Sequence, residues 1–167
     1  MGPLMVRTLG ELVTALRREG LVTHAPPSQE PVSVTGVSAD SRSIGSANVF
    51  FAVRGTASDG HEYVADAIER GAAAVVVERA TGAAVPEVIV SDGRRAAHIA
   101  GQTWYRRPAD ELVMIGVTGT NGKTTTTALI RHLLNAAGTA GSIGTLGAMD
   151  GAGLSVPSTA GALTTPG

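Results

Sequence analysis

Apolar residues recur at helical spacing in three stretches of the chain. Between residues 8 and 18 an apolar side chain returns every three or four positions, which predicts a short amphipathic helix with Thr8 as N-cap and Gly20 beyond its end. The same spacing predicts helices over 62–70 and 94–105. The expected inner face of the helix over 62–70 consists of Val64, Ala65 and Ile68.

Between these helices the apolar residues follow the period of extended chain. Residues 32–37 alternate apolar and small polar side chains, 48–53 hold both phenylalanines, and 88–90 form a short apolar run, so each predicts a strand. The continuous apolar run over 72–77 is typical of a strand buried on both faces. Residues 24–31 contain three prolines and predict a loop. Alternation of strands and helices indicates an α/β fold class.

A short linker is expected where Pro108 interrupts the chain after the helix over 94–105. We place the domain boundary there, so that residues 1–108 form a small α/β domain and residues 109–167 begin a second domain.

The second domain is expected to open with the first βαβ unit of a parallel sheet. Residues 112–117 predict a strand, 123–137 a helix with Gly138 as its C-cap, and 140–144 the next strand. Residues 145–167 are rich in Gly, Ala, Ser, Thr and Pro and predict loops. A doubly wound sheet needs further strands, so the chain looks truncated within this domain.

A glycine-rich loop, Gly-Val-Thr-Gly-Thr-Asn-Gly-Lys-Thr from Gly116 to Thr124, lies at the expected strand-to-helix turn. Glycines there let backbone N–H groups converge on an anion at the helix N-terminus. Lys123, the only lysine, can neutralise β- and γ-phosphates, and the Thr124 hydroxyl can bind Mg²⁺. Val117 stands where the usual phosphate loop has its first glycine, so the strict motif fails by one position. The residues expected to bind ATP are Gly119, Thr120, Asn121, Gly122, Lys123, Thr124 and Thr125.

Two polar clusters in the first domain admit more than one interpretation. Residues 39–43 could bind a ligand, or could form a turn in which Asp40 pairs with Arg42. His61 follows Asp59, an expected helix cap, and a histidine in a first helical turn is more often structural than catalytic. No second histidine or carboxylate at metal-ligand spacing accompanies it.

Composition and charge narrow the function classes. With 43% hydrophobic and 16% charged residues the composition is globular, and a formal net charge of −1 gives no electrostatic case for nucleic acid. The absence of cysteine excludes disulfides and thiolate metal sites, and no apolar run is long enough to span a membrane. The start of the chain lacks the apolar core of a secretion signal. We therefore expect a cytoplasmic monomer without nucleic-acid binding or membrane insertion.

Five segments spread over nearly the whole chain carry a family resemblance. They are Asp40-Ser41-Arg42; Val49-Phe50-Phe51-Ala52 through Gly55; Asp59-Gly60-His61 with residues 71–76; Gly116 through Thr127; and Ile143 to Gly147 with Leu163-Thr164-Thr165-Pro166. In these segments the chain resembles the Mur ligase family of peptidoglycan synthesis, whose loop is similar to Gly-x-Thr-Gly-Thr-x-Gly-Lys-Thr. Within the family, Thr120-Asn121 favours the ligases that add the third residue to UDP-N-acetylmuramoyl-L-alanyl-D-glutamate.

The resemblance implies a first domain that binds the UDP end of the substrate, followed by the start of a central ATP-binding domain. By this likeness the substrate contacts are Ala39, Ser41, Thr56, Ala57, Ser58, Thr164 and Thr165. Around Thr164 and Thr165 the chain departs from the family pattern in two ways. In the family, Leu-Thr-Thr-Pro follows Pro-Ser-Thr almost directly, whereas here Ala160-Gly161-Ala162 lie between them. An acidic residue then follows in the family, and Gly167 takes its place here.

The resemblance also implies amide-bond formation dependent on ATP and Mg²⁺. The γ-phosphoryl group passes to the D-Glu side-chain carboxylate, and the amine of a diamino acid attacks the resulting acyl phosphate. Lys123 would be catalytic by stabilising charge on the transferring group. Family members continue well beyond this length, with further metal ligands and a domain that selects the diamino acid, so the identity of that amino acid stays open and the chain alone is expected to be inactive.

Two alternatives come from other classes. One is a non-catalytic UDP-sugar-binding module with a vestigial nucleotide loop. The other is a generic P-loop NTPase, which the displaced first glycine and the preceding domain disfavour. An NTPase would also be expected to carry a later strand that ends in a metal-binding Asp, and the sequence shows none.

Overall fold

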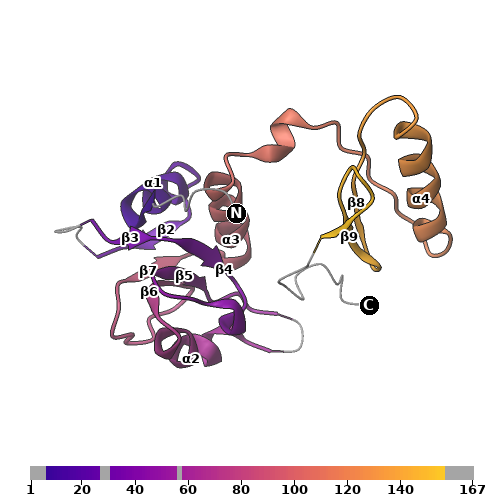
Figure 1. Cartoon of the computed structure of the whole chain (residues 1–167). Helices are drawn as coiled ribbons and strands as arrows, with labels where there is room; N and C mark the ends of the chain where they lie inside the picture. Colours follow the sequence, from indigo (N-terminus) through magenta and orange to yellow (C-terminus); the bar gives the residue numbers. More distant parts are fainter. Residues whose placement is uncertain (1–6, 27–30, 56–57, 157–167) are drawn as a thin grey trace. The chain divides into compact units, whose positions relative to one another are not determined.

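The protein, described here from a computed structural model, is defined over residues 7–26, 31–55 and 58–156. It divides into two compact units, one up to Glu111 and the other from Leu112 (Figure 1). Our sequence analysis placed this division at residue 108.

The first unit is built on a five-stranded sheet with the strand order β2-β7-β6-β5-β4. The strands are β2 (Val22–His24), β4 (Gly36–Ser38), β5 (Asn48–Phe51), β6 (Ala72–Val77) and β7 (Glu87–Val90). Strands β4 to β7 pair in parallel, and β2 is antiparallel to β7. A separate antiparallel pair joins β1 (Arg7–Thr8) to β3 (Ser33–Val34). This mixed sheet confirms the α/β class.

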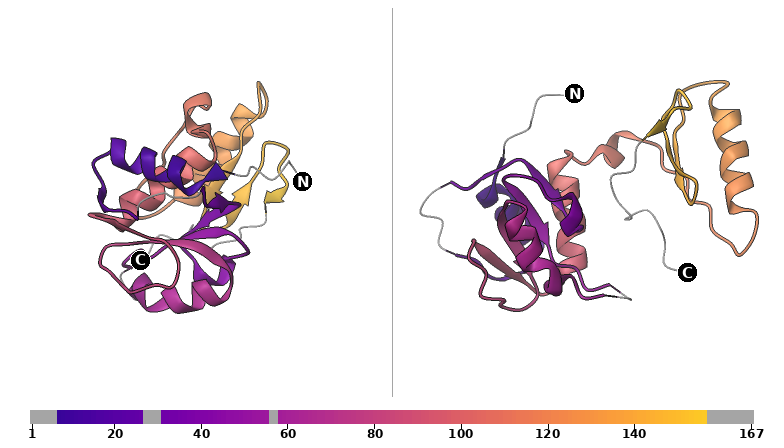
Figure 2. Two further views of the ribbon diagram at one scale, coloured as in Figure 1. Left: turned by 90° about the vertical axis from the view of Figure 1, so that its left-hand side faces the viewer. Right: turned by 60° about the horizontal axis from the view of Figure 1, so that its bottom comes forward.

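Helices cover both faces of this sheet. The helices α1 (Leu9–Arg18) and α3 (Gly93–Trp104) lie on one face, and α2 (Val64–Glu69) lies on the other (Figures 1 and 2). Alternate residues of β6 enter two different cores: Ala74 and Val76 pack in the cluster with α1 and α3, whereas Val75 and Val77 pack in the cluster with α2. The prediction that this strand is buried on both faces is confirmed.

The ends of α1 follow local capping rules. The Thr8 hydroxyl accepts a hydrogen bond from the Glu11 N–H at 3.3 Å, and the Glu11 carboxylate accepts one from the Thr8 N–H at 3.4 Å, which completes a capping box. Gly20 beyond the helix adopts a left-handed φ of 69°. The predicted start and stop of this helix are confirmed.

Several elements of the first unit differ from the prediction. Residues 22–24 form β2, an edge strand that the search for apolar runs missed because a strand of three residues is too short to show a period. The strand expected over 32–37 is two strands, β3 and β4, in different sheets. The helix expected over 62–70 begins earlier, as the 3₁₀ helix η2 (Gly60–Tyr63) that leads into α2.

The inner face of α2 is also corrected. Ala65 is exposed, and Ala67 takes the buried position beside Val64. Val64, Ala67 and Ile68 stand at i, i+3 and i+4 within α2 and so share one face, which leaves Ala65 outside it.

The second unit pairs one helix with a small antiparallel sheet. Its elements are α4 (Lys123–Leu134), β8 (Ser142–Gly144), β9 (Gly147–Met149) and β10 (Ser155–Val156), with the strand order β10-β9-β8. The loop prediction for residues 145–167 is therefore wrong at 147–149 and 155–156, which form strands, and holds for the turns at 145–146 and 150–154. The rest lies outside the described residues. The helix ends at Leu134 with Asn135 as C-cap, not at Gly138.

The strand expected over 112–117 is not formed. The side chains of residues 112–115 are exposed, from 54% at Ile115 to 93% at Val113, and Val117 is half-buried. A strand needs a hydrogen-bonded neighbour, and no strand in the described part of the second unit lies beside this segment. The βαβ unit is therefore seen only as its helix and its second strand, and that strand pairs with β9 in antiparallel fashion.

Candidate nucleotide loop and substrate-binding edge

The glycine-rich loop ends where α4 begins. Gly122 is the N-cap of α4, with a left-handed φ of 77°, and Gly119 has a φ of 138°. Both are conformations that a side chain disfavours, which explains glycine at these two positions. No side chain caps this helix, so the N–H groups of its first turn point outward without a side-chain acceptor. Such a turn can bind phosphate.

The Lys123 side chain folds back onto the glycine-rich loop that precedes it. Its ammonium donates hydrogen bonds to the carbonyl oxygens of Gly119 and Thr120, the second at 3.3 Å. Among the described residues, no carboxylate lies within ion-pair distance of it. The side chain is exposed. The ammonium charge is therefore close to the loop amides and accessible to an anion.

The structure brings all expected ATP-binding residues together at this turn. Residues 119–125 are exposed, and Thr124 and Thr125 belong to the first turn of α4. Within the described residues, no group of three His, Cys, Asp or Glu side chains forms a metal site. Thr124 would thus contribute one oxygen ligand to Mg²⁺, which commonly completes its octahedron with phosphate oxygens and water. The donor set fits a magnesium nucleotide.

The expected substrate contacts of the first unit lie at one edge of its sheet. Strands β4 and β5 are parallel neighbours, so the loops that follow them leave from the same carboxyl edge, where open α/β sheets bind their ligands. Ala39 and Ser58 in these loops are exposed, whereas Ser41 is buried. Four further expected contacts, Thr56, Ala57, Thr164 and Thr165, lie outside the described residues.

The turn after β4 takes the structural form that we considered. Arg42 donates from Nε to Asp40 Oδ1 at 2.9 Å and from Nη2 to Oδ2 at 2.8 Å. This paired guanidinium lowers the pKa of Asp40. Ser41 opens the 3₁₀ helix η1 (Ser41–Ser43), and its hydroxyl lowers the pKa of Asp66 of α2. The Ser41 side chain is buried on the side of α2.

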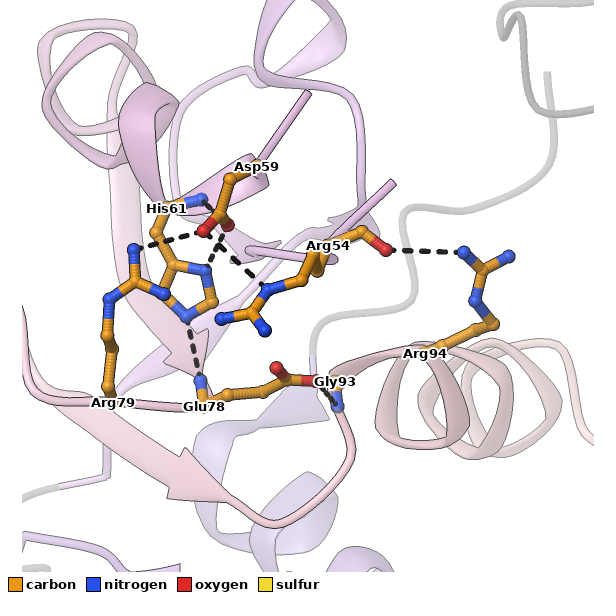
Figure 3. A network of polar contacts seen from close by, with 7 residues as sticks. All are labelled: Arg54, Asp59, His61, Glu78, Arg79, Gly93 and Arg94. Atoms are coloured by element: carbon orange, nitrogen blue, oxygen red, sulfur yellow. Dashed lines mark hydrogen bonds and ion pairs between the residues drawn. The ribbon is translucent and has the colours of Figure 1, made fainter. Parts of the chain in front are cut away.

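The structure shows that His61 is buried, and it confirms that Asp59 caps the helical turn that begins at Gly60. It also adds two residues that the sequence analysis missed, Glu78 and Gly93, both connected to His61 through hydrogen bonds (Figure 3). The only local signal was a carboxylate directly after the apolar run of β6. Nothing in the sequence connects it to a histidine 17 positions earlier.

Within the described residues, no helix is both long and apolar enough to cross a membrane.

Polar loops at the carboxyl edge of a parallel sheet and a glycine-rich loop at a helix N-terminus are features that α/β nucleotide-binding proteins share. Residues 33–105 match the family model described as Mur ligase family, catalytic domain, and residues 117–166 match the one described as Mur ligase middle domain. The chain belongs to the Mur ligase family.

Curated relatives carry the name UDP-N-acetylmuramoyl-L-alanyl-D-glutamate--2,6-diaminopimelate ligase. The protein of Geobacillus kaustophilus is 46% identical over 114 residues, which cover 68% of this chain and 23% of that protein. The protein of Aquifex aeolicus is also 46% identical over 114 residues, which cover 68% of this chain and 24% of that protein. The chain thus spans about a quarter of the length of these relatives.

Solved structures of MurF from Acinetobacter baumannii are similar in fold. One crystal structure matches with a TM-score of 0.61 and 28% identity, covering 81% of this chain and 29% of that one. Another, of a UDP-N-acetylmuramoylalanyl-D-glutamyl-2,6-diaminopimelate--D-alanyl-D-alanyl ligase, matches with a TM-score of 0.58 and 27% identity, covering 82% and 30%.

Proposed function

We propose that this chain carries the UDP-sugar-binding and nucleotide-binding parts of an ATP-dependent ligase of peptidoglycan synthesis. The ligase would add a diamino acid to UDP-N-acetylmuramoyl-L-alanyl-D-glutamate. The observation that carries the proposal is the exposed loop of residues 119–125 at an uncapped helix N-terminus, in a chain 46% identical over 114 residues to ligases of that name.

In the second unit, the loop would bind the nucleotide phosphates. The amides of the first turn of α4 and the Lys123 ammonium supply positive charge, and Thr124 supplies one ligand for Mg²⁺. ATP would provide a phosphoryl group that activates the D-Glu carboxylate for attack by an amine. Lys123 would act as the catalytic residue of this chain, by stabilising negative charge on that phosphoryl group during its transfer.

In the first unit, the carboxyl edge of the sheet would bind the UDP end of the substrate. Ala39 and Ser58 are the exposed expected contacts, and Ser41, the third, is buried at the start of η1. Thr56 and Ala57 belong to the same proposed contact, and Thr164 and Thr165 to the muramoyl-peptide contact. Binding the substrate far from its reacting carboxylate would orient that group. Both ATP and nucleotide sugars are cytoplasmic, so we place the protein there, as a monomer.

Separate titrations of the 167-residue chain with Mg·ATP and with UDP test the proposal. We expect both to bind, and Lys123→Ala to weaken Mg·ATP at least about tenfold, or about 1.4 kcal/mol, without changing UDP binding. Arg131→Gln is the matched control, since it removes a positive charge from the same helix away from the loop. Binding of UDP alone would support the non-catalytic module instead. ATP hydrolysis without any UDP binding would support a generic NTPase.

A further inference from the structure

Three successive loops of the first unit meet at the carboxyl edge of the sheet. Strands β5, β6 and β7 are parallel, so the segments after them leave from the same edge. These segments carry, in order, Asp59 and His61, then Glu78 and Arg79, then the N-terminus of α3 at Gly93. Figure 3 shows that the side chains from the first two segments point toward one another.

The His61 ring is the centre of this cluster. Its side chain is only 2% exposed, and both ring nitrogens have partners. Nε2 lies 2.9 Å from the backbone nitrogen of Glu78, whose N–H can only donate, so Nε2 accepts and carries no proton. A neutral ring then has its proton on Nδ1, which donates to Asp59 Oδ1 at 2.6 Å. The environment therefore selects one tautomer.

Glu78 continues the connection to the third loop. Its Oε1 accepts a hydrogen bond from the backbone N–H of Gly93 at 2.8 Å, at the start of α3. A β-carbon at Gly93 would lie 3.2 Å from that oxygen and 3.3 Å from the Ala52 carbonyl oxygen, so the close approach depends on glycine. One histidine thus connects the loop after β5 with the end of β6 and, through Glu78, with α3.

Asp59 is held as an anion on the other side of the ring. It accepts the backbone N–H of His61 at 3.1 Å, and its Oδ2 lies 3.0 Å from Arg79 and 3.8 Å from Arg54. The backbone N–H and the ring of His61, with Arg79, lower the pKa of this carboxyl well below its usual range. At neutral pH Asp59 is therefore an ionised acceptor for the Nδ1 proton.

Polar contacts hold the described ends of the segment between Val53 and Gly60. Arg54, Gly55 and Ser58 are exposed. The Gly55 N–H donates to the Ser58 carbonyl oxygen at 2.9 Å, and the Gly60 N–H donates to the Val53 carbonyl oxygen at 3.1 Å. The Arg94 side chain donates to the Arg54 carbonyl oxygen at 3.2 Å. A buried polar connection at the end of this segment is worth more than a surface one, because either partner left alone would be desolvated without compensation.

We propose that His61 is a positioning residue that holds Ser58 and Asp59, at the end of the segment after β5, where a pyrimidine nucleoside diphosphate binds. The inference rests on the proposed function, since Ser58 of this loop is an expected contact of the UDP group. His61 itself does not touch the ligand. Its two ring nitrogens join Asp59 to the backbone N–H of Glu78, and these two hydrogen bonds, called here the polar bridge, cross the edge of the sheet.

A ¹H–¹⁵N NMR titration of the 167-residue chain with UDP tests this, using three substitutions of His61. His61→Gln keeps an acceptor near the Glu78 N–H, His61→Asn keeps a donor near Asp59, and His61→Phe keeps neither. We expect His61→Phe to weaken UDP binding at least about tenfold and to speed amide exchange at Glu78 by about tenfold or more. His61→Gln should restore the slow exchange of Glu78 more fully than His61→Asn. His98→Gln, at an exposed position of α3, is the control and should change neither.

The wild-type ring should show an unprotonated Nε2 and a protonated Nδ1 in its ¹⁵N spectrum. If UDP binds the wild type and His61→Phe equally, the positioning role is overturned while the proposed function stands. If the wild type binds no UDP, the proposed function fails, and with it the ligand of this loop; the Glu78 exchange rates then show separately whether the bridge exists. Should His61→Phe not fold, equal UDP affinity and equal Glu78 exchange in His61→Gln, His61→Asn and the wild type overturn the proposal.

Discussion

The backbone N–H of Gly60 donates a hydrogen bond to the carbonyl oxygen of Val53 at 3.1 Å. The two backbones approach so closely that a β-carbon at Gly60 would lie 2.6 Å from that oxygen and 2.7 Å from the Val53 nitrogen. Real β-carbons do not come this near to backbone atoms, so the contact allows only glycine. It closes the loop after β5 next to the buried His61.

Gly60→Ala should therefore destabilise the first unit by about 1–3 kcal/mol, because backbone atoms must move to admit the methyl group. Urea unfolding followed by the fluorescence of Trp104, the only tryptophan and a buried one, measures this. Gly101→Ala is the matched control, since nothing lies within 4 Å of its added β-carbon inside α3. There alanine should stabilise by about 0.5–1 kcal/mol. A Gly60→Ala chain as stable as the wild type would contradict the close approach.

The core between α1 and the sheet predicts a large effect at Leu16. This side chain is 1% exposed and packs in the cluster that contains Trp104. Leu16→Ala should cost about 2–5 kcal/mol, from lost burial and the remaining cavity. Leu133→Ala removes the same atoms from a side chain that is 69% exposed. It should change the free energy of unfolding, followed by Trp104 fluorescence, by less than about 0.5 kcal/mol. Similar losses at both positions would show that α1 is not packed as described.

The capping box at the start of α1 predicts a smaller effect. Thr8→Ala removes the acceptor of the Glu11 N–H and should cost about 1 kcal/mol in the free energy of unfolding. Thr14→Ala in the same helix removes a hydroxyl bonded to the Gly10 carbonyl at 2.7 Å, a bond that the helix does not need. It should be neutral or slightly stabilising, because alanine is the better helix former. Equal effects of the two changes would count against the cap.

The ionised Asp59 predicts a pH dependence of stability. Its pKa is lower in the folded chain than its unfolded value of about 3.9, so the unfolded state binds more protons in acid. The stabilisation is therefore complete above about pH 5 and is lost as the pH falls below about 4. Asp59→Asn should be less stable than the wild type at neutral pH, and the difference should shrink in acid.

Unfolding measured between about pH 2 and pH 7 tests this sign. The control is Asp110→Asn, which removes a carboxylate from an exposed ion pair with Arg107 at 3.0 Å and should leave the pH profile nearly unchanged. A stability difference between Asp59→Asn and the wild type that widens in acid would exclude the assigned role of this carboxylate.

Much of the fold and part of the site could be predicted from neighbouring residues. The apolar runs of β5 and β6 and the helical spacing and cap of α1 depend on residues a few positions apart, and the structure confirms these elements. The Asp40–Arg42 turn, one of two interpretations of its segment, is equally local. The glycines at 119 and 122 likewise indicate the left-handed backbone that they adopt before α4.

The remaining features depend on residues far apart in the chain. A strand forms only beside another, so the apolar run over 112–117 stays unpaired while residues 147–149 and 155–156 pair within an expected loop. The tautomer of His61 depends on the backbone N–H of Glu78, 17 positions away, and the Glu78 side chain in turn bonds to the start of α3. The sequence by itself determined the local periods, caps and glycine turns, because their causes lie within a few bonds. Only the tertiary structure decided the strand pairing and the buried hydrogen bonds, because both need partners that folding brings together.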